Sequence, residues 1–172
     1  VDCDHFVIYG FGAIQLGGKS IHLLPDVNAS PIVNGLVNGL VCYNKDGTAL
    51  FNDDTKILYQ VSGEAPNRVL TVEFRQIGLT QAWGASAQHA ITYQISIKED
   101  GTISYCFEEF DAGEEYYNFY IGLTGNKDEY MTLGGSGEYL EDDNSYSTNA
   151  NYTVINKIAA GKTVTLTPPA DC

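Results

Sequence analysis

Histidines and acidic residues are the side chains of this sequence whose types could support catalysis. The three histidines, His5, His22 and His89, are scattered along the chain, and no serine lies in the G-x-S-x-G pattern of a nucleophile elbow. A histidine on a strand or loop is more often structural than catalytic, although His5 or His22 would be the candidate general base. We therefore expect no enzyme activity.

Acidic side chains also occur in adjacent pairs, as in Glu108-Glu109 and Glu114-Glu115. A glycosidase uses two carboxyl groups roughly 5–10 Å apart across a cleft. Nothing in the sequence selects such a pair, and 22 acidic residues in a chain of 172 produce neighbours by chance. We interpret the pairs as solvated loop residues, so a glycoside-acting enzyme ranks behind the binding functions.

Two oxygen-rich stretches are the best candidates for a metal site. Glu141, Asp142 and Asp143 follow one another in EDDNS, and Asp128 lies in GNKDE. Carboxylate oxygens are ligands that Ca²⁺ prefers, but neither stretch has the spacing of an EF-hand loop. We expect no obligatory cofactor, with Ca²⁺ at these four residues as the alternative.

The four cysteines, Cys3, Cys42, Cys106 and Cys172, are widely spaced. No CxxC pair is present and no histidine lies at ligand spacing from any of them, which argues against a zinc site. An even count with wide spacing fits two disulfides formed in an oxidising compartment. Because domain termini are often close together, we favour Cys3–Cys172 and Cys42–Cys106, with four buried thiols as the alternative.

A carbohydrate site would need an exposed aromatic ring on which a sugar stacks. Trp83 lies in the polar, small-residue stretch LTQAWGASAQH, and Tyr116 and Tyr117 follow an acidic run. These three residues form the candidate ligand platform. The alternative interpretation of Trp83 is a residue that caps the core.

The chain as a whole is acidic, with a formal net charge of −13 and a pI near 4.3. Such a surface repels phosphate backbones and anionic lipids, so we expect neither a nucleic-acid partner nor membrane insertion. No stretch reaches the roughly 18 apolar residues that span a bilayer. Apolar residues make up 44% of the chain, which is enough to build a core at this length.

Alternation of apolar and polar residues predicts the strands that must position these side chains. The clearest case is a hairpin of Ile91–Ile97 and Ile103–Phe107 around the turn KEDG, with Cys106 facing away from the main aromatic row. Leu70–Arg75 alternates in the same way. The other expected strands are His5–Ile14, broken at its glycines, Ser20–Leu24, Val33–Tyr43, Thr48–Phe51, Ile57–Val61, Asn118–Thr124, Tyr130–Leu133 and Val164–Thr167.

No segment shows helical periodicity, and the glycine- and asparagine-rich stretch Gly134–Asn151 predicts a long surface loop. About ten short strands at regular spacing are typical of a β-sandwich or jelly roll. We therefore predict an all-β protein. Residues 1–172 would form a single domain, a two-sheet antiparallel β-sandwich that is jelly-roll-like and disulfide-bonded.

The turn after Ile57–Val61 carries the most specific motif. YQVSGEAPNRVLTVEF, which ends at Phe74, resembles the SGTAPNRxFTVEW motif of extracellular β-sandwich modules in Bacteroidetes. ITYQISIKEDGTISYCF, FYIGLTGNKDEYMTLGGSG and INKIAAGKTVTLTP resemble later segments of these modules, in the same order. The resemblance covers about Ile57–Pro168, and it departs from the motif at Phe74, where the modules usually have Trp.

The resemblance implies a module of large secreted or surface proteins, often exported by the type IX route and distantly similar to nidogen-type or concanavalin-type sandwiches. No catalytic set defines the family, so none is carried over. Gly63, Pro66 and Asn67 then form a structural turn that sets the register of the flanking strands. Arg68 follows this turn, and it would either pair with a carboxylate or remain a solvated surface residue.

These observations together predict a non-catalytic, secreted or cell-surface module with a structural or adhesive role. Its partners would be other protein subunits, either further copies of itself or surface proteins, as in a self-assembling extracellular filament. A carbohydrate-binding module that contacts glycans is the alternative.

Overall fold

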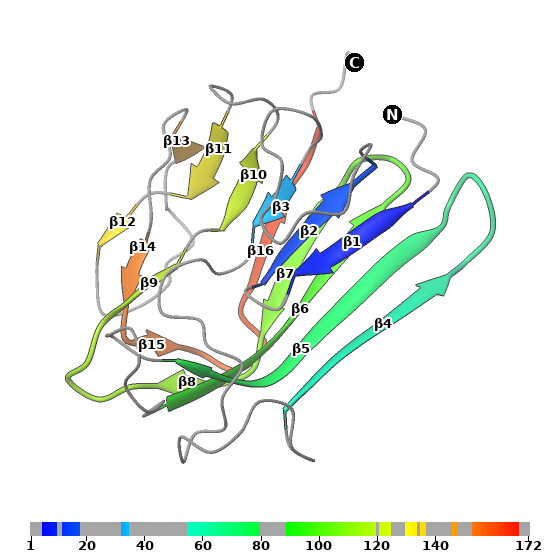
Figure 1. Ribbon diagram of the computed structural model, residues 1–172. Coiled ribbons are helices and arrows are strands. Elements are labelled where there is room, and N and C mark those ends of the chain that lie inside the picture. The colour runs from blue at the N-terminus through cyan, green and yellow to red at the C-terminus, as the bar shows by residue number, and fades with distance from the viewer. Residues whose placement is uncertain are drawn as a thin grey trace.

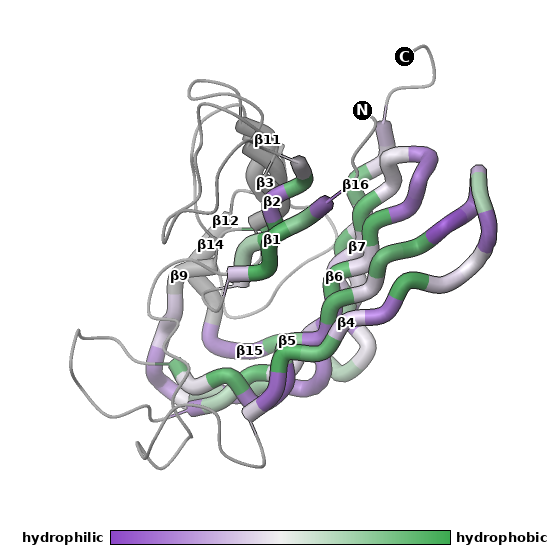
Figure 2. The backbone as a smooth tube through the Cα atoms, turned by 45° about the vertical axis from the view of Figure 1, so that its right-hand side comes forward, coloured by the Kyte–Doolittle hydropathy of each residue, from purple (hydrophilic) through white to green (hydrophobic). Residues whose placement is uncertain are grey.

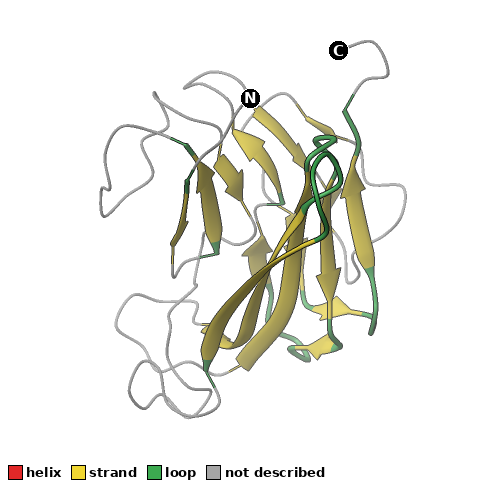
Figure 3. Cartoon of the chain, turned by 90° about the vertical axis from the view of Figure 1, so that its right-hand side faces the viewer, coloured by secondary structure: helices red, strands yellow, loops and turns green. Residues whose placement is uncertain are grey.

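The computed structural model describes residues 5–9, 12–17, 32–34, 55–79, 89–119, 121–124, 130–133, 135–136, 146–147 and 153–168. Every regular element within these ranges is a strand, and no helix occurs in them (Figure 3). The prediction of an all-β fold is therefore confirmed for the described part of the chain.

The longest strands form a five-stranded antiparallel sheet in the order β16-β7-β6-β5-β4. Its central pair matches the expected hairpin, with the turn between the two strands at the predicted residues. The members are β4 (Lys56–Ser62), β5 (Val69–Leu79), β6 (His89–Lys98), β7 (Ile103–Phe107) and β16 (Thr163–Leu166).

A second, six-stranded sheet has the order β1-β2-β3-β10-β11-β13, and two small sheets adjoin these larger ones (Figure 1). The six strands are β1 (Phe6–Tyr9), β2 (Ala13–Leu16), β3 (Ile32–Asn34), β10 (Gly122–Thr124), β11 (Tyr130–Leu133) and β13 (Tyr146–Ser147). The small sheets contain β12 (Gly135–Ser136), β14 (Thr153–Ile155) and β9 (Tyr117–Phe119), and β15 (Lys157–Ile158) with β8 (Phe110–Asp111).

The two large sheets enclose one main apolar core, which makes the fold β-sandwich-like. Ile14 of β2 packs in the same buried cluster as Val72 and Phe74 of β5 and Tyr105 of β7. Hydrophobic and hydrophilic residues alternate along the strands of the five-stranded sheet (Figure 2). Alternation with period two sends one set of side chains into the core and the other to solvent.

A β-bulge lengthens β5 beyond the strand that simple alternation predicts. Pairing with β6 runs to Phe74–Tyr93 and resumes at Ile77–Ile91, so β5 has one extra residue between these pairs. Gln76 occupies the bulge with φ +49°. The bulge returns Ile77 to the core, where it is fully buried, and thereby extends the strand to Leu79.

Several expected strand boundaries were wrong. Asn118–Thr124 was expected as one strand, but its residues divide between β9, which pairs with β14, and β10, which pairs with β3 and β11. Gly134–Asn151 was expected as a loop, yet it contributes β12 and β13. Main-chain hydrogen bonding does not depend on side-chain type, so polar composition failed to predict these two short strands.

One strand pair also departs from the expected antiparallel arrangement. β12 runs parallel to β14, whereas the remaining pairs among the described strands are antiparallel. The expected strands Ser20–Leu24 and Thr48–Phe51 lie outside the described residues, as does most of Val33–Tyr43.

Candidate binding surface

Strand β4 is an edge strand of the five-stranded sheet (Figure 1). It pairs with β5 along its whole length, and the pairs Tyr59–Val72 and Val61–Leu70 place its odd-numbered residues on the core face of the sheet. Val72 is fully buried, yet Tyr59 is 65% exposed and Val61 53% exposed. The core face of β4 is therefore exposed at Tyr59 and Val61, whereas Ile57 near the start of the strand packs against the core.

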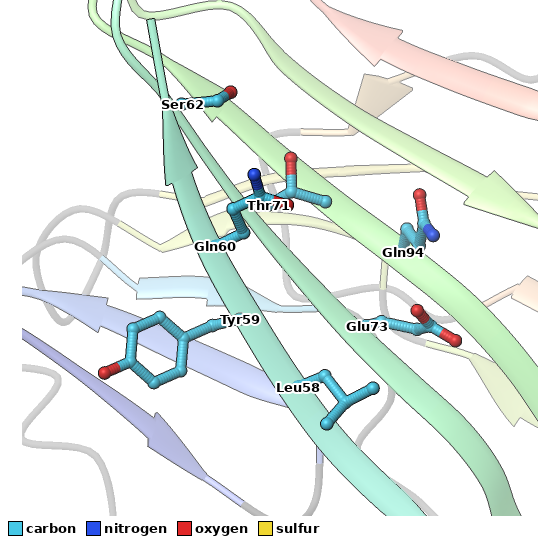
Figure 4. A pocket seen from close by; sticks show the side chains of 7 residues that line it. All are labelled: Leu58, Tyr59, Gln60, Ser62, Thr71, Glu73 and Gln94. Carbon is cyan, nitrogen blue, oxygen red and sulfur yellow. The ribbon is translucent and has the colours of Figure 1, made fainter.

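The outer face of β4 borders a shallow polar trough of about 370 Å³. Gln60, Thr71, Glu73 and Gln94 present their polar side chains on this face, while the ring of Tyr59 points away from them (Figure 4). The complete lining is Leu58, Tyr59, Gln60, Ser62, Thr71, Glu73 and Gln94.

Two of the polar groups in the trough are already engaged within the sheet. The Thr71 hydroxyl lies 3.2 Å from that of Ser96, and the Glu73 carboxylate accepts a hydrogen bond from Arg75 Nε at 2.6 Å. The exposed amides of Gln60 and Gln94 extend from β4 and β6, the two strands on either side of β5. The trough thus offers amide donors and acceptors to a polar ligand and has one aliphatic wall, Leu58.

The turn between β4 and β5 has a tightly specified geometry. Gly63 has φ +78°, and a Cβ at this position would lie 2.5 Å from the Asn67 carbonyl oxygen. The Asn67 N–H closes the turn by donating to the Glu64 carbonyl at 2.7 Å, and the Ala65–Pro66 peptide is cis. These contacts fix the course of the chain where it leaves β4, which accounts physically for the glycine in this motif.

Arg68 connects this turn to the neighbouring turn between β6 and β7. Its Nε donates to Glu99 Oε1 at 2.8 Å, and its backbone N–H donates to Glu99 Oε2 at 2.7 Å. The Glu99 N–H donates in return to the Arg68 carbonyl at 3.1 Å. The side-chain hydrogen bonds from Arg68 lower the pKa of the Glu99 carboxyl, and the backbone N–H of Arg68 lowers it further. Of the two alternatives for Arg68, the structure shows pairing with a carboxylate.

We expect Glu99→Gln to lower Tm slightly at neutral pH, on the order of 1–2 °C, because this ion pair is exposed. A carboxyl whose pKa is lower in the folded state than in the unfolded state stabilises the fold above its unfolded pKa. That stabilisation is lost as pH falls through the folded pKa. The Tm difference from the original chain should therefore be present above about pH 5 and should shrink in acid.

Differential scanning calorimetry across this pH range measures the effect. Glu109→Gln is the matched control, because it makes the same charge change at an exposed position on the link between β7 and β8. An equal response of the two variants at every pH would show that net charge, and not the Arg68 contact, causes the shift.

A second polar cluster, which sequence analysis missed, lies where β6 begins. His89 Nδ1 is 2.9 Å from the Tyr117 hydroxyl, which donates to Glu115 Oε2 at 3.0 Å. Burial raises the pKa of Tyr117, and the hydrogen bond to Glu115 raises it further. The phenol is therefore a neutral donor that orients its own ring beside His89 and Phe110. Residues 89 and 117 lie far apart in the chain, so their spacing gave no signal.

The sequence of the chain matches a known protein family. A family model described as NIDO related matches residues 2–168. The chain belongs to this nidogen-related family. NIDO-related domains are generally extracellular. No curated protein and no solved structure matches the chain.

The described part of this nidogen-related chain includes only some of the residues that the sequence singled out. Tyr116 is 44% exposed, whereas Tyr117 is 3% exposed and is held in the cluster with Glu115. Trp83 lies outside the described residues, as do the calcium candidates. Those candidates are Asp128, Glu141, Asp142 and Asp143, and calcium binding there stays a prediction.

The cysteine predictions are tested only at β7. Cys106 is exposed on the outer face, opposite the buried Tyr105 and Phe107, as the alternation predicted, and no disulfide joins it to another described residue. Cys3, Cys42 and Cys172 lie outside the described residues, so both disulfide pairings stay predictions. Within the described ranges, no helix is long and apolar enough to cross a membrane.

Proposed function

We propose that this chain is a non-catalytic, secreted or cell-surface module, structural or adhesive, that acts by binding other proteins. The observation that carries this function is β4, an edge strand on which Leu58, Tyr59 and Val61 remain exposed. The main-chain groups of such a strand can bind an extended segment of another chain, and its side chains provide specificity. Membership of the nidogen-related family supports an extracellular location.

The same proposal includes a finer fold and source. The chain would be a jelly-roll-like sandwich of the Bacteroidetes type, exported by the type IX route and stabilised by the disulfides Cys3–Cys172 and Cys42–Cys106. The motif resemblance at Gly63–Arg68 supports this assignment, because the structure gives its glycine and arginine defined roles in the turn.

Carbohydrate binding is the second candidate function. The polar trough beside β4 supports it, since exposed amides and an aliphatic wall suit the hydroxyls and the apolar face of a sugar. Tyr116 is a further exposed ring on which a sugar could stack.

Bead attachment tests the two functions against each other. Beads coated with the purified chain are mixed with cells of the producing organism after one of two treatments. Protease removes surface proteins, and mild periodate oxidises glycan diols. Protein binding predicts that protease abolishes attachment and that periodate leaves it intact. Loss with periodate alone would support the glycan candidate and overturn the proposed function, as would a failure to attach to untreated cells.

A matched pair of variants connects attachment to β4. Tyr59→Lys should reduce attachment several-fold, whereas Thr165→Lys should not, because Thr165 is an exposed residue of β16 at the opposite margin of the same sheet. Equal attachment by both variants would show that β4 is not the binding strand.

A further inference from the structure

We infer that β4 pairs antiparallel with β4 of a second copy of this chain, around a twofold axis at Tyr59. This inference rests on the proposed function, since it names the protein partner of the same strand. In the described part of the sheet β5 is the only strand that pairs with β4. Such a strand uses one side of its backbone for β5 and presents N–H and C=O groups on the other.

The opposite edge strand, β16, shows why pairing with a second copy is more favourable at β4. Val164 and Leu166 of β16 are only 7% and 4% exposed, and the exposed side chains of that strand are those of Thr163 and Thr165. A second copy at β16 would cover hydroxyls that are already hydrated. On β4 it would instead cover apolar groups, which is the favourable term in association.

Tyr59 and Val61 form an exposed apolar row on the core face of β4, and Leu58 is an exposed apolar residue on its outer face. Leu58 is 43% exposed, and Tyr59 and Val61 are more exposed still. The ring of Tyr59 meets that of Phe6 edge to face, with centroids 5.6 Å apart. This contact connects the exposed residues of β4 to β1, the edge strand of the six-stranded sheet on the same side of the molecule (Figure 1).

The sequence of β4, KILYQVS, is complementary to itself when it is reversed. A twofold axis at Tyr59 places the two Tyr59 rings opposite each other and Ile57 opposite Val61 of the second copy. It also places Leu58 opposite Gln60. This is the register that pairs all seven residues of the strand, and it puts the β-branched and aromatic side chains of one face side by side. Such cross-strand pairs stabilise antiparallel sheets.

Charge favours contact at this strand over the rest of the surface. Each copy carries a formal net charge of −13, so two copies repel one another in general. β4 contains no acidic residue, and its one charged side chain, Lys56, falls opposite Ser62 of the second copy in the twofold register. No like charges meet directly across the pair.

Apart from Lys56 at its first position, the strand lacks the features that natural sheets use to block such pairing. Edge strands that are protected against pairing carry proline, bulges or inward-pointing charges. β4 has no proline, and its pairing with β5 is unbroken from Lys56–Arg75 to Ser62–Val69. Its polar residues, Gln60 and Ser62, are neutral.

The size of the contact sets the expected strength. A pair of seven-residue strands covers less than the roughly 1,200 Å² of a standard stable interface. We therefore expect a dissociation constant between about micromolar and millimolar. Because a twofold contact uses the same strand in both copies, association through β4 alone stops at a dimer. Copies held close together on a surface would pair more completely.

Sedimentation velocity over about 10 µM to 1 mM protein tests the pairing. The weight-average mass of the original chain should rise from 18.7 kDa toward twice that value and then level off. Tyr59→Lys places two positive charges opposite each other and should remain monomeric. Thr165→Lys makes the same charge change on β16 and should dimerise like the original chain. Val61→Lys is a second variant if Tyr59→Lys alters the thermal unfolding curve.

A separate cross-linking experiment tests the register between the two β4 strands. Photo-oxidative tyrosine cross-linking of the dimer should join Tyr59 of one copy to Tyr59 of the other, as identified by peptide mass spectrometry. A dimer whose cross-links omit Tyr59 would overturn the register, and dimerisation of both β4 lysine variants would overturn the use of β4.

A monomeric original chain at every concentration would overturn the inference alone. If beads coated with that chain still attached to protease-sensitive cells, the proposed function would stand with a different protein as the partner of β4. If attachment also failed, the proposed function would fall with it.

Discussion

Replacing Phe74 with alanine should lower the free energy of unfolding by about 3–5 kcal/mol. Phe74 is fully buried on β5, between β4 and β6 of the five-stranded sheet. Its ring stacks on that of Tyr93 with centroids 4.9 Å apart, and Tyr93 in turn stacks on Phe107 at 5.8 Å. The substitution removes one end of this aromatic stack and leaves a cavity between the two large sheets, which well-packed neighbours can fill only in part.

Equilibrium unfolding in urea measures this effect. Leu58→Ala is the control, since Leu58 is an exposed apolar residue of the adjacent strand, and it should cost less than about 1 kcal/mol. A loss below that value for Phe74→Ala would contradict the packing described here, because it would mean that the core is not closed around the ring.

Gly63→Ala should have the second largest effect, a loss of about 2–3 kcal/mol. Two costs add at this position. A non-glycine residue at φ +78° is strained, and the new Cβ would lie 2.5 Å from the Asn67 carbonyl oxygen. Because that oxygen belongs to the backbone of the same turn, the turn must open to relieve the overlap.

Gly161→Ala separates the two costs. Gly161 has φ +74°, but a Cβ there would meet no atom within 4 Å, so this variant carries the backbone strain without the overlap. It should lose about 1 kcal/mol. Urea unfolding of both variants gives the difference, and equal losses would show that the turn between β4 and β5 yields without cost.

The Gly63 variant also connects stability to binding. The turn begins where β4 ends, and Arg68 ties it to Glu99 in the next hairpin. A turn that opens would free the last residues of β4 from their register with β5. Binding through β4 depends on an extended strand of fixed course, so loss of this turn should weaken association as well as folding.

Much of the fold was accessible from local patterns. Alternation correctly predicted β6, β7 and the first part of β5, because a strand with one buried face must repeat every two residues. Short strand-forming runs also predicted β4, β11 and β16. The position of Cys106 on the outer face followed from the same period. Pairing of Arg68 with a carboxylate was one of two alternatives from the sequence, and only the structure chose it over a solvated side chain.

Other features depend on contacts between distant segments. The bulge at Gln76, the division of Asn118–Thr124 between two sheets and the meeting of His89 with Tyr117 each arise from pairing partners far along the chain. Residues of similar strand propensity run through these segments without a break. Local propensity therefore cannot show where one sheet ends and the next begins.

The sequence by itself determined that the chain forms strands, which face of the β6–β7 hairpin is apolar, and that the chain is strongly acidic. Only the tertiary structure decided that Tyr59 and Val61 of β4 remain exposed while the equivalent face of β16 is buried. The sequence predicts both segments as strands and does not show which of them is covered. Burial depends on which strands of the opposite sheet lie across them, and that arrangement is a property of the whole fold.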